Sequence, residues 1–271
     1  MNNDILQQIV AHKRLEVEQQ KQAVSLRTLL ALGSERLERP TRSMRAALEQ
    51  SPSGIIAEFK RRSPSKGWLS PGAQVEDVVP AYARAGAAAC SVLTDERFFG
   101  GSLGDLQRAR NVAAIPLLRK DFIVDEYQLF QARVMGADAV LLIAAVLTED
   151  ESVALAETAH SLDLEVLLEI HSEAELRNLH PGAVDMLGVN NRHLGTFHTS
   201  VDTSFRLAEH LRRSLPAGHQ PLLVSESGIS DAATVERLRE TGFRGFLIGE
   251  TFMRSPEPGR ALGTFIGGGP L

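Results

Sequence analysis

The sequence contains little cysteine and no long apolar run. Cys90 is the only cysteine among 271 residues, so no disulfide can form within the chain. Small and apolar neighbours surround it, which predicts a buried, unreactive thiol. The longest uncharged apolar run, Ala139 to Leu147, is far shorter than the roughly 20 residues that a membrane span requires. These absences argue against a disulfide framework and against a membrane-spanning helix.

The chain also lacks an excess of positive charge. It carries 29 Lys and Arg against 34 Asp and Glu, for a net charge of -5 and a pI near 5.9. Nucleic-acid-binding domains usually carry a clear basic excess. The charged N-terminus, MNNDILQQIVAHKR, lacks the apolar core of a signal peptide. We therefore expect a cytoplasmic protein with neither a nucleic-acid nor a membrane partner.

Short apolar segments typical of strands recur from Ile55 onward. They begin near residues 55, 89, 115, 137, 164, 185, 221 and 245, and helical patterns separate them. Parallel neighbours need crossover connections, so this alternation predicts parallel βαβ units. Eight equivalent units favour a closed α/β fold, the (β/α)8 TIM barrel, whose usual size is about 250 residues. An open doubly wound sheet is less favoured, because no Gly-x-Gly-x-x-Gly follows the first strand.

The residues before the first strand are predicted to be helical. Ile5 and Ile9 lie on an apolar stripe at helical spacing, and Lys13 is assigned to the charged residues beside that stripe. No strand is predicted in this part of the chain. We expect residues 1–271 to form a single barrel domain, with residues 1–50 as its N-terminal helical extension.

Polar residues gather at the C-terminal ends of the predicted strands. In a TIM barrel these ends surround the mouth where the active site lies. An ordinary loop residue or a local ion pair explains any one of them, but their shared position favours a functional site. The strand-end residues are Glu58, Lys60, Lys120, Glu169, Asn190, Arg192 and Glu226.

These side chains suit proton transfer. A lysine and a glutamate that face one barrel mouth can act as proton donor and acceptor, and we assign these roles to Lys120 and Glu169. Asn190 and Arg192 could orient hydroxyls or a carboxylate, since arginine offers a planar fork of donors. The groups that could share the proton transfers are Glu58, Lys60 and Glu169.

Glycine and serine follow the seventh and eighth predicted strands. Barrels often bind phosphate there, because glycine lets backbone N–H groups approach the anion closely. The candidate phosphate contacts are Ser227, Gly228 and Gly249, with Lys60 and Ser63 reaching from the first strand.

Six motifs together resemble a known family. AEFKRRSPSKG, LLRKDF, LLEIH, GVNNR, SESGI and FLIGE occur in this order, and with the N-terminal ILQQIVAHKRLEV they are similar to the indole-3-glycerol-phosphate synthases of tryptophan biosynthesis. The resemblance covers nearly the whole chain. It implies ring closure of a phosphorylated small molecule, 1-(2-carboxyphenylamino)-1-deoxyribulose 5-phosphate, to indole-3-glycerol phosphate. Carbon dioxide and water are lost, and neither a cofactor nor a metal is implied.

The resemblance also implies roles for individual residues. Lys120 would be the general acid on the ribulose carbonyl, and Glu169 would act in the later dehydration. The residues that match the polar lining of the family's site are Glu58, Lys60, Asn190, Arg192 and Glu226. The residues that match its phosphate contacts are Ser63, Ser227, Gly228 and Gly249. Glu250 stands where some members carry serine, so at this position we expect only the backbone N–H to contact phosphate.

Other functions remain open at this point. A Schiff-base aldolase of the same fold would also need a buried lysine at a strand end. A non-catalytic phosphate-binding barrel would explain the glycines but would leave Lys120 and Glu169 without a role. A metal enzyme is less favoured, because His171, His193 and His198 lie in no recognised ligand spacing.

The loop after the first strand admits two interpretations. Gly67 and Gly72 are pliable points and Pro64 and Pro71 stiff ones, a composition that suits a lid closing over a ligand. The alternative is a rigid surface loop in which Trp68 packs as an ordinary anchor.

Overall fold

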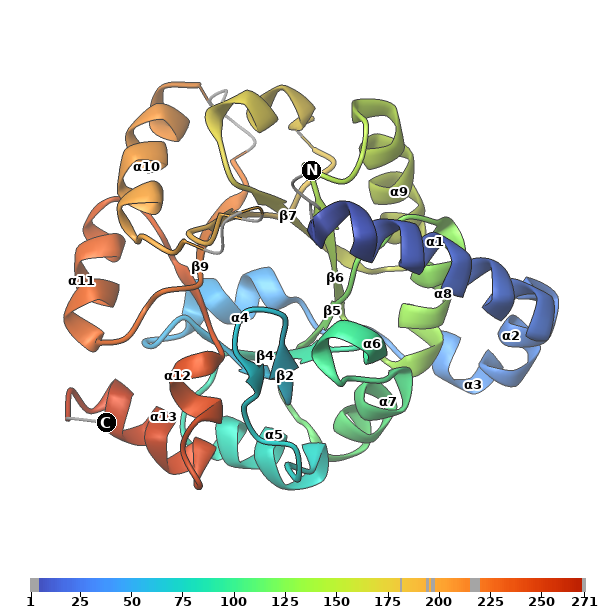
Figure 1. The fold of residues 1–271 in the computed structure, drawn as a ribbon, viewed down its shortest axis with the longest axis horizontal. Coiled ribbons are helices and arrows are strands. Elements are labelled where there is room, and N and C mark those ends of the chain that lie inside the picture. The colour runs from blue at the N-terminus through green and yellow to red at the C-terminus, as the bar shows by residue number, and fades with distance from the viewer. Residues whose placement is uncertain (1–4, 181, 194, 196–197, 215–219, 270–271) are drawn as a thin grey trace.

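The centre of the molecule is a closed barrel of eight parallel strands (Figure 1). The computed structural model describes residues 5–180, 182–193, 195, 198–214 and 220–269. The barrel strands are β1 (Ile55–Phe59), β4 (Ala89–Leu93), β5 (Leu117–Lys120), β6 (Ala139–Ile143), β7 (Glu165–Ile170), β8 (Met186–Asn190), β9 (Leu222–Glu226) and β10 (Gly245–Ile248). Strand β10 pairs with β1, which closes the ring and confirms the predicted TIM barrel.

Helices surround the barrel and connect its strands (Figure 1). The helices between strands are α5 (Val75–Arg84), α6 (Glu96–Phe99), α7 (Leu103–Val112), α8 (Glu126–Met135), α9 (Glu149–Ser161), α10 (Asp202–Ser214) and α11 (Ala232–Glu240), and after the last strand come α12 (Glu250–Met253) and α13 (Pro258–Ile266). Local sequence signals set several of their ends. Thr148 and Glu151, for example, form a reciprocal capping box at the start of α9, which satisfies backbone N–H groups there.

One predicted helix differs in type. The segment after β7 is a 3₁₀ helix, η1 (Glu173–Asn178), rather than an α-helix. The Glu175 side chain accepts hydrogen bonds from the His171 backbone N–H at 2.9 Å and from the Ser172 hydroxyl at 3.0 Å. These bonds tie the segment back to the end of the strand, which suits the tight, short geometry of a 3₁₀ turn.

The core has an inner and an outer layer. Inside the barrel, alternate strand residues such as Ile56, Leu118 and Leu167 pack on one another. The other face of each strand packs against the surrounding helices in a second, larger cluster. Because both faces are buried, the strands read as continuous apolar runs, which is why the sequence showed their positions clearly.

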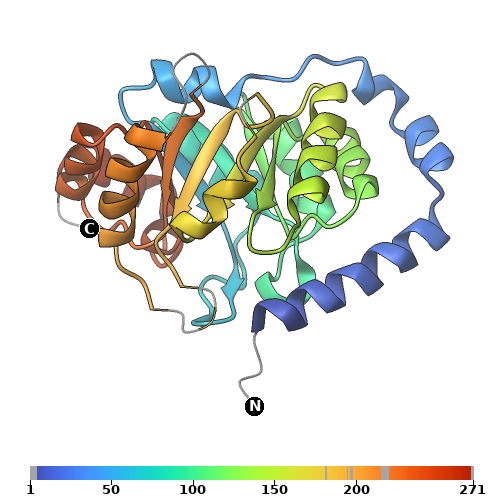
Figure 2. The same cartoon turned by 90° about the horizontal axis from the view of Figure 1, so that it is seen from above.

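The N-terminal extension spans the length of the barrel. Its helices are α1 (Ile5–Ala23), α2 (Leu26–Leu32), α3 (Ser34–Leu37) and α4 (Met44–Gln50). Figure 2 shows α1 beside one end of the barrel, while the chain runs past its flank to α4 at the other end. Met44 and Leu48 of α4 join the inner apolar layer, and the Ser43 hydroxyl donates to Glu165 at the start of β7. Helix α4 therefore closes the end of the barrel opposite to the strand C-termini.

The structure corrects the predicted placement of Lys13. This residue is 0% exposed and lies between Ile9 and Val17 on the buried side of α1. Its Nζ lies 3.0 Å from the carboxylates of both Asp95 and Asp121. A buried charge needs such partners, because desolvating an unpaired ammonium is costly. The helix is therefore attached to the barrel by an ion pair within its apolar stripe.

In the described part of the chain, no helix is long and apolar enough to cross a membrane.

Candidate active site

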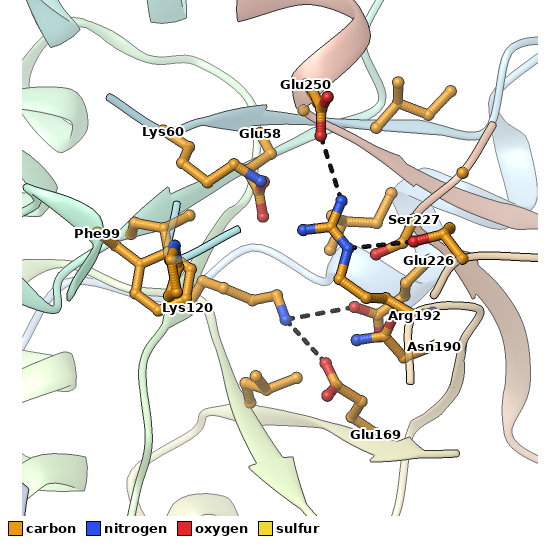
Figure 3. A pocket seen from close by; sticks show the side chains of 18 of the residues that line it. Glu58, Lys60, Phe99, Lys120, Glu169, Asn190, Arg192, Glu226, Ser227 and Glu250 are labelled. Carbon is orange, nitrogen blue, oxygen red and sulfur yellow. Dashed lines mark hydrogen bonds and ion pairs between the residues drawn. The ribbon is translucent and has the colours of Figure 1, made fainter. Parts of the chain in front are cut away.

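A cavity of about 430 Å³ lies at the C-terminal ends of the strands. Figure 3 shows polar side chains from different strands converging on it. The predicted site residues that line the cavity are Glu58, Lys60, Lys120, Glu169, Asn190, Arg192, Glu226, Ser227, Gly228, Gly249 and Glu250. The barrel thus brings together residues that are up to 192 positions apart in the sequence, from Glu58 to Glu250.

Lys120 occupies the centre of this group. Its Nζ lies 2.8 Å from Glu169 Oε2 and 3.3 Å from Glu226 Oε2 (Figure 3). Burial disfavours the ammonium, but the carboxylates of Glu169, Glu226 and Glu58 outweigh burial and raise the pKa of Lys120. Lys120 is therefore held as an ammonium ion that can donate a proton.

The two carboxylates beside Lys120 differ in charge. Burial disfavours ionisation of both. At Glu169 the Lys120 ammonium and His171 outweigh burial and lower the pKa to about 2. At Glu226 burial and the neighbouring Glu169 outweigh the effect of Lys120 and raise the pKa to about 8. Of the two glutamates beside Lys120, Glu169 is therefore an ionised proton acceptor, and Glu226 holds its proton more readily.

A second ion pair faces the same cavity from β1. Lys60 Nζ lies 2.5 Å from Glu58 Oε1, and both residues are largely buried. The alternation of the strand puts both side chains on the barrel interior. Glu58 and Lys60 therefore form an ion pair at the cavity wall.

Two glycines provide space for the glutamates. A Cβ atom at Gly249 would lie 2.3 Å from Glu58 Oε1, and one at Gly188 would lie 2.1 Å from Glu226 Oε1. Any larger residue at either position would displace a carboxylate from the cavity wall. Gly249 was predicted as a point of close approach to phosphate. The structure shows that its missing side chain also makes room for Glu58.

Glu250 interacts with two arginines at the rim. Its carboxylate lies 3.2 Å from Arg192 Nη2 and 2.6 Å from Arg254 Nη2. Arg192 also donates to Thr199 Oγ1 at 3.3 Å and to Ser65 Oγ at 3.4 Å. The Glu250 side chain therefore holds two arginines at the cavity rim. The sequence, in which Glu250 stands where some family members carry serine, did not indicate this role.

Ser63 is the one predicted site residue that does not line the cavity. It is 1% exposed, and its hydroxyl accepts a hydrogen bond from the Lys66 backbone N–H at 3.2 Å. Other parts of the same loop, Pro64 and Lys66, reach the cavity instead. A direct contact between Ser63 and phosphate therefore stays a prediction.

The loop after β1 contains a small hairpin, which the sequence did not indicate. Strands β2 (Arg62–Ser63) and β3 (Gly67–Trp68) pair in antiparallel fashion. Arg61 fixes the base of the loop through Asp105, at 2.7 Å. Trp68 is 56% exposed, with the Arg62 guanidinium 5.6 Å from its ring centre. Trp68 is therefore exposed, and closure of the loop over a ligand stays a prediction.

Sequence reasoning missed several residues of the cavity wall. Ile5, Leu6 and Ile9 come from α1 and Phe99 from α6, and they form an apolar wall. Their patterns were those of ordinary core residues, so only the packing of α1 at the barrel mouth identifies them. Arg254 was missed because it follows the last motif; a signal did exist, since it lies four residues after Glu250 on a helix.

The three histidines considered in the sequence, His171, His193 and His198, have other partners in the described structure. His171 lies beside Glu169, with Nε2 3.3 Å from Glu169 Oε1. The His193 backbone N–H donates to the His198 carbonyl at 2.8 Å, outside the cavity wall. Among the residues that the structure describes, no group of three or more His, Cys, Asp or Glu side chains could hold a metal ion.

Comparison with known proteins identifies relatives along the whole chain. The profile of the family described as indole-3-glycerol phosphate synthase matches residues 6–265. Proteins of that name from several organisms are similar to this chain. The one from Bacteroides thetaiotaomicron is 57% identical over 97% of this chain and 98% of its own length. Those from Neisseria gonorrhoeae and Polaromonas naphthalenivorans are 45% and 43% identical, over 96% and 98% of this chain and 98% and 99% of their own lengths.

Solved structures resemble the fold at low sequence identity. A mutant tryptophan synthase alpha-subunit from Pyrococcus furiosus is 12% identical, with a TM-score of 0.59 over 80% of this chain and 97% of that one. A second mutant of the same subunit has a TM-score of 0.60 over the same shares. At this identity the likeness concerns the barrel fold alone.

Proposed function

The chain belongs to the indole-3-glycerol phosphate synthase family, and from that premise we propose how its cavity performs the reaction. The substrate is 1-(2-carboxyphenylamino)-1-deoxyribulose 5-phosphate and the product is indole-3-glycerol phosphate. The ring carbon that bears the carboxylate bonds to the ribulose carbonyl carbon. Carbon dioxide then leaves that ring carbon, and the former carbonyl oxygen leaves as water. The observation that carries the proposal is the Lys120 ammonium between Glu169 and Glu226 in the cavity.

Lys120 acts first in this proposal. Negative charge develops on the carbonyl oxygen as the new carbon–carbon bond forms, and a nearby ammonium can both stabilise it and donate a proton. The raised pKa of Lys120 supports a protonated resting state. Glu169, whose pKa is lowered, then accepts a proton during the loss of water. Glu58 and Lys60 face the same space and can share these transfers.

The substrate phosphate is proposed to bind in the same cavity, away from Lys120 and Glu169. Ser227, Gly228 and Gly249 line it with backbone groups, and cationic side chains of Lys66, Arg192 and Arg254 line the same cavity. Arginine offers a planar fork that matches phosphate oxygens. Asn190 lines the same cavity beside Glu169, where it can orient a substrate hydroxyl.

The remaining expectations belong to the same proposal. Residues 1–271 work as one barrel domain, and residues 1–50 serve as its extension. A small phosphorylated substrate is the ligand and nucleic acid is not a partner, which the acidic balance of the chain supports. The cytoplasm is the proposed place of action.

Incubation with the carboxyphenylamino-deoxyribulose phosphate tests the function directly. We expect indole fluorescence to appear, with inorganic phosphate competing against the substrate. The dephosphorylated substrate is the matched control and should bind more weakly. Well-folded protein that forms no indole product would contradict the proposed function, and equal binding of the dephosphorylated compound would contradict the phosphate site.

A further inference from the structure

His171 is a buried titratable residue that directly follows the site but does not line the cavity. It comes after the last residue of β7, two positions beyond Glu169, and its side chain is 10% exposed. Its Nε2 atom lies 3.3 Å from Glu169 Oε1, whereas Lys120 contacts the other oxygen, Oε2. Glu169 therefore lies between two nitrogen-containing side chains, Lys120 inside the cavity and His171 behind the cavity wall.

A second carboxylate lies beside the other nitrogen of the imidazole ring. Glu175 Oε2 lies 3.5 Å from His171 Nδ1. Backbone and hydroxyl donors at His171 and Ser172 hold this carboxylate in place. The arrangement runs Glu175, His171, Glu169, Lys120, so that acidic and basic groups alternate along it.

The charges around the ring favour its protonated form. Burial disfavours the imidazolium, but Glu175 and Glu169, with Glu226 beyond them, outweigh burial and raise the pKa of His171. These acids come from η1, β7 and β9, and Lys120 of β5 is the cation on the far side of Glu169. A positive charge on this ring lies directly behind the Glu169 carboxylate.

We propose that His171 is a positioning residue that acts through Glu169. Its imidazolium keeps the Glu169 carboxylate ionised and oriented toward Lys120, and Glu175 keeps the ring in place. This role rests on the proposed function, because it concerns the group that accepts a proton in that reaction. His171 itself touches no substrate in this account.

The first test is the pH dependence of turnover in His171→Asn. Loss of a neighbouring cation raises the pKa of a carboxylate, so the acidic limb of the kcat profile should move up by about one pH unit. The KM should change little, because the side chain lies outside the cavity. A structural role alone would instead lower kcat by the same factor at every pH, and that result would overturn the proposal.

His160→Asn is the matched control. His160 forms a similar pair with Asp185, at 2.9 Å, but Asp185 precedes β8 at the other end of the barrel. Its replacement should leave the kcat profile at its wild-type position. An equal shift in both variants would show a general effect of losing a histidine charge and would also overturn the proposal.

A second test needs no substrate. The imidazole titration of His171, followed by NMR and assigned from its loss in His171→Asn, should move to lower pH in Glu169→Gln. Removing one flanking anion should lower this pKa by about one unit. An unchanged titration would overturn the coupling even in an active enzyme. If the wild-type protein showed no turnover, the proposed function would be refuted. The NMR titration would still show whether His171 and Glu169 interact.

Discussion

Two buried lysines in this molecule have the same kind of surroundings and different consequences. Lys13 lies between Asp95 and Asp121, and Lys120 lies between Glu169 and Glu226. In both cases burial disfavours the ammonium, yet the neighbouring carboxylates outweigh it and raise the pKa of the lysine. The two groups even adjoin, because Asp121 directly follows Lys120 in the chain.

The groups differ in whether the lysine faces the cavity. Asp121 accepts hydrogen bonds from Thr94 at 2.6 Å and from Arg119 at 2.9 Å, in addition to its contact with Lys13. Each cluster also contains one buried carboxylate oxygen without a hydrogen-bond partner among the described residues, Asp95 Oδ2 beside Lys13 and Glu226 Oε1 beside Lys120. Lys120 lines the cavity and Lys13 does not.

This contrast shows that access to the cavity, and not ion pairing, separates a structural lysine from a catalytic one. Lys13 does not line the cavity and its ammonium cannot reach a ligand there, so it attaches helix α1 to the barrel. Lys120 lines the cavity, where its cluster can complete its hydrogen bonds with substrate, so Lys120 is placed to do chemistry. The predictions below test this separation.

Lys120→Ala should produce the largest effect. Removing a proton donor commonly costs about 10²- to 10⁴-fold in rate, and we expect a loss of at least 10²-fold in kcat with an unchanged circular dichroism spectrum. Turnover of the purified variant gives the measurement. Near-wild-type turnover, together with a large loss in Lys60→Ala, would show that Lys60 is the acid instead.

Lys13→Met should mainly destabilise the fold. Breaking a buried ion pair leaves unpaired carboxylates, which costs about 3 kcal/mol in free energy of unfolding. Denaturant unfolding measures this cost. Lys21→Met is the control on the same helix, because Lys21 pairs with Asp125 at a more exposed position and should cost less than about 1 kcal/mol. Equal costs for the two variants would contradict the burial argument.

Gly249→Ala should impair the site through Glu58. The added Cβ would lie 2.3 Å from Glu58 Oε1, so the carboxylate must move. A displacement of this size near the reacting groups should lower kcat/KM by roughly 10- to 10²-fold. Gly263→Ala, where the nearest atom to the added Cβ lies at 4.0 Å, is the control and should be close to wild type. A normal kcat/KM in Gly249→Ala would remove the steric assignment.

Glu226→Gln should change how stability depends on pH. The folded pKa of Glu226, about 8, lies above the ordinary value of 4.5, so its contribution to stability is present below pH 4.5 and is lost as the pH rises toward 8. Glutamine does not titrate. The free energy of unfolding of the variant relative to wild type should therefore increase between pH 5 and pH 9, by about 1 kcal/mol or more.

Parallel unfolding titrations at the two pH values measure this difference. Glu236→Gln is the matched control, because its side chain is 74% exposed on a helix surface. That control should show no pH-dependent difference from wild type. A Glu226→Gln curve that stays parallel to wild type would show that Glu226 is ionised throughout.

The sequence was sufficient for the barrel and for most of the site. The strands are buried on both faces and so stand out as apolar runs, and parallel pairing places all their C-terminal ends together. That is why Lys120, Glu169 and Glu226 could be grouped from the sequence alone. The fold follows from regular patterns that the chain repeats.

What could not be predicted depends on contacts between distant residues. Lys13 was assigned to the polar side of its helix because its partners, Asp95 and Asp121, follow about a hundred residues later. The hairpin of β2 and β3 is only two residues per strand, too short for an alternating pattern. The space that Gly249 leaves for Glu58 likewise appears only when β1 and β10 are paired.

The central claim is that Lys120 works as an ammonium acid and not as a nucleophilic amine. Adding borohydride during turnover of the carboxyphenylamino-deoxyribulose phosphate tests it, because borohydride reduces a Schiff base to a stable adduct. We predict continued formation of the indole product and an unchanged intact protein mass, since a protonated lysine cannot attack a carbonyl. A mass increase located on the peptide that contains Lys120 would contradict the claim and would favour a Schiff-base mechanism.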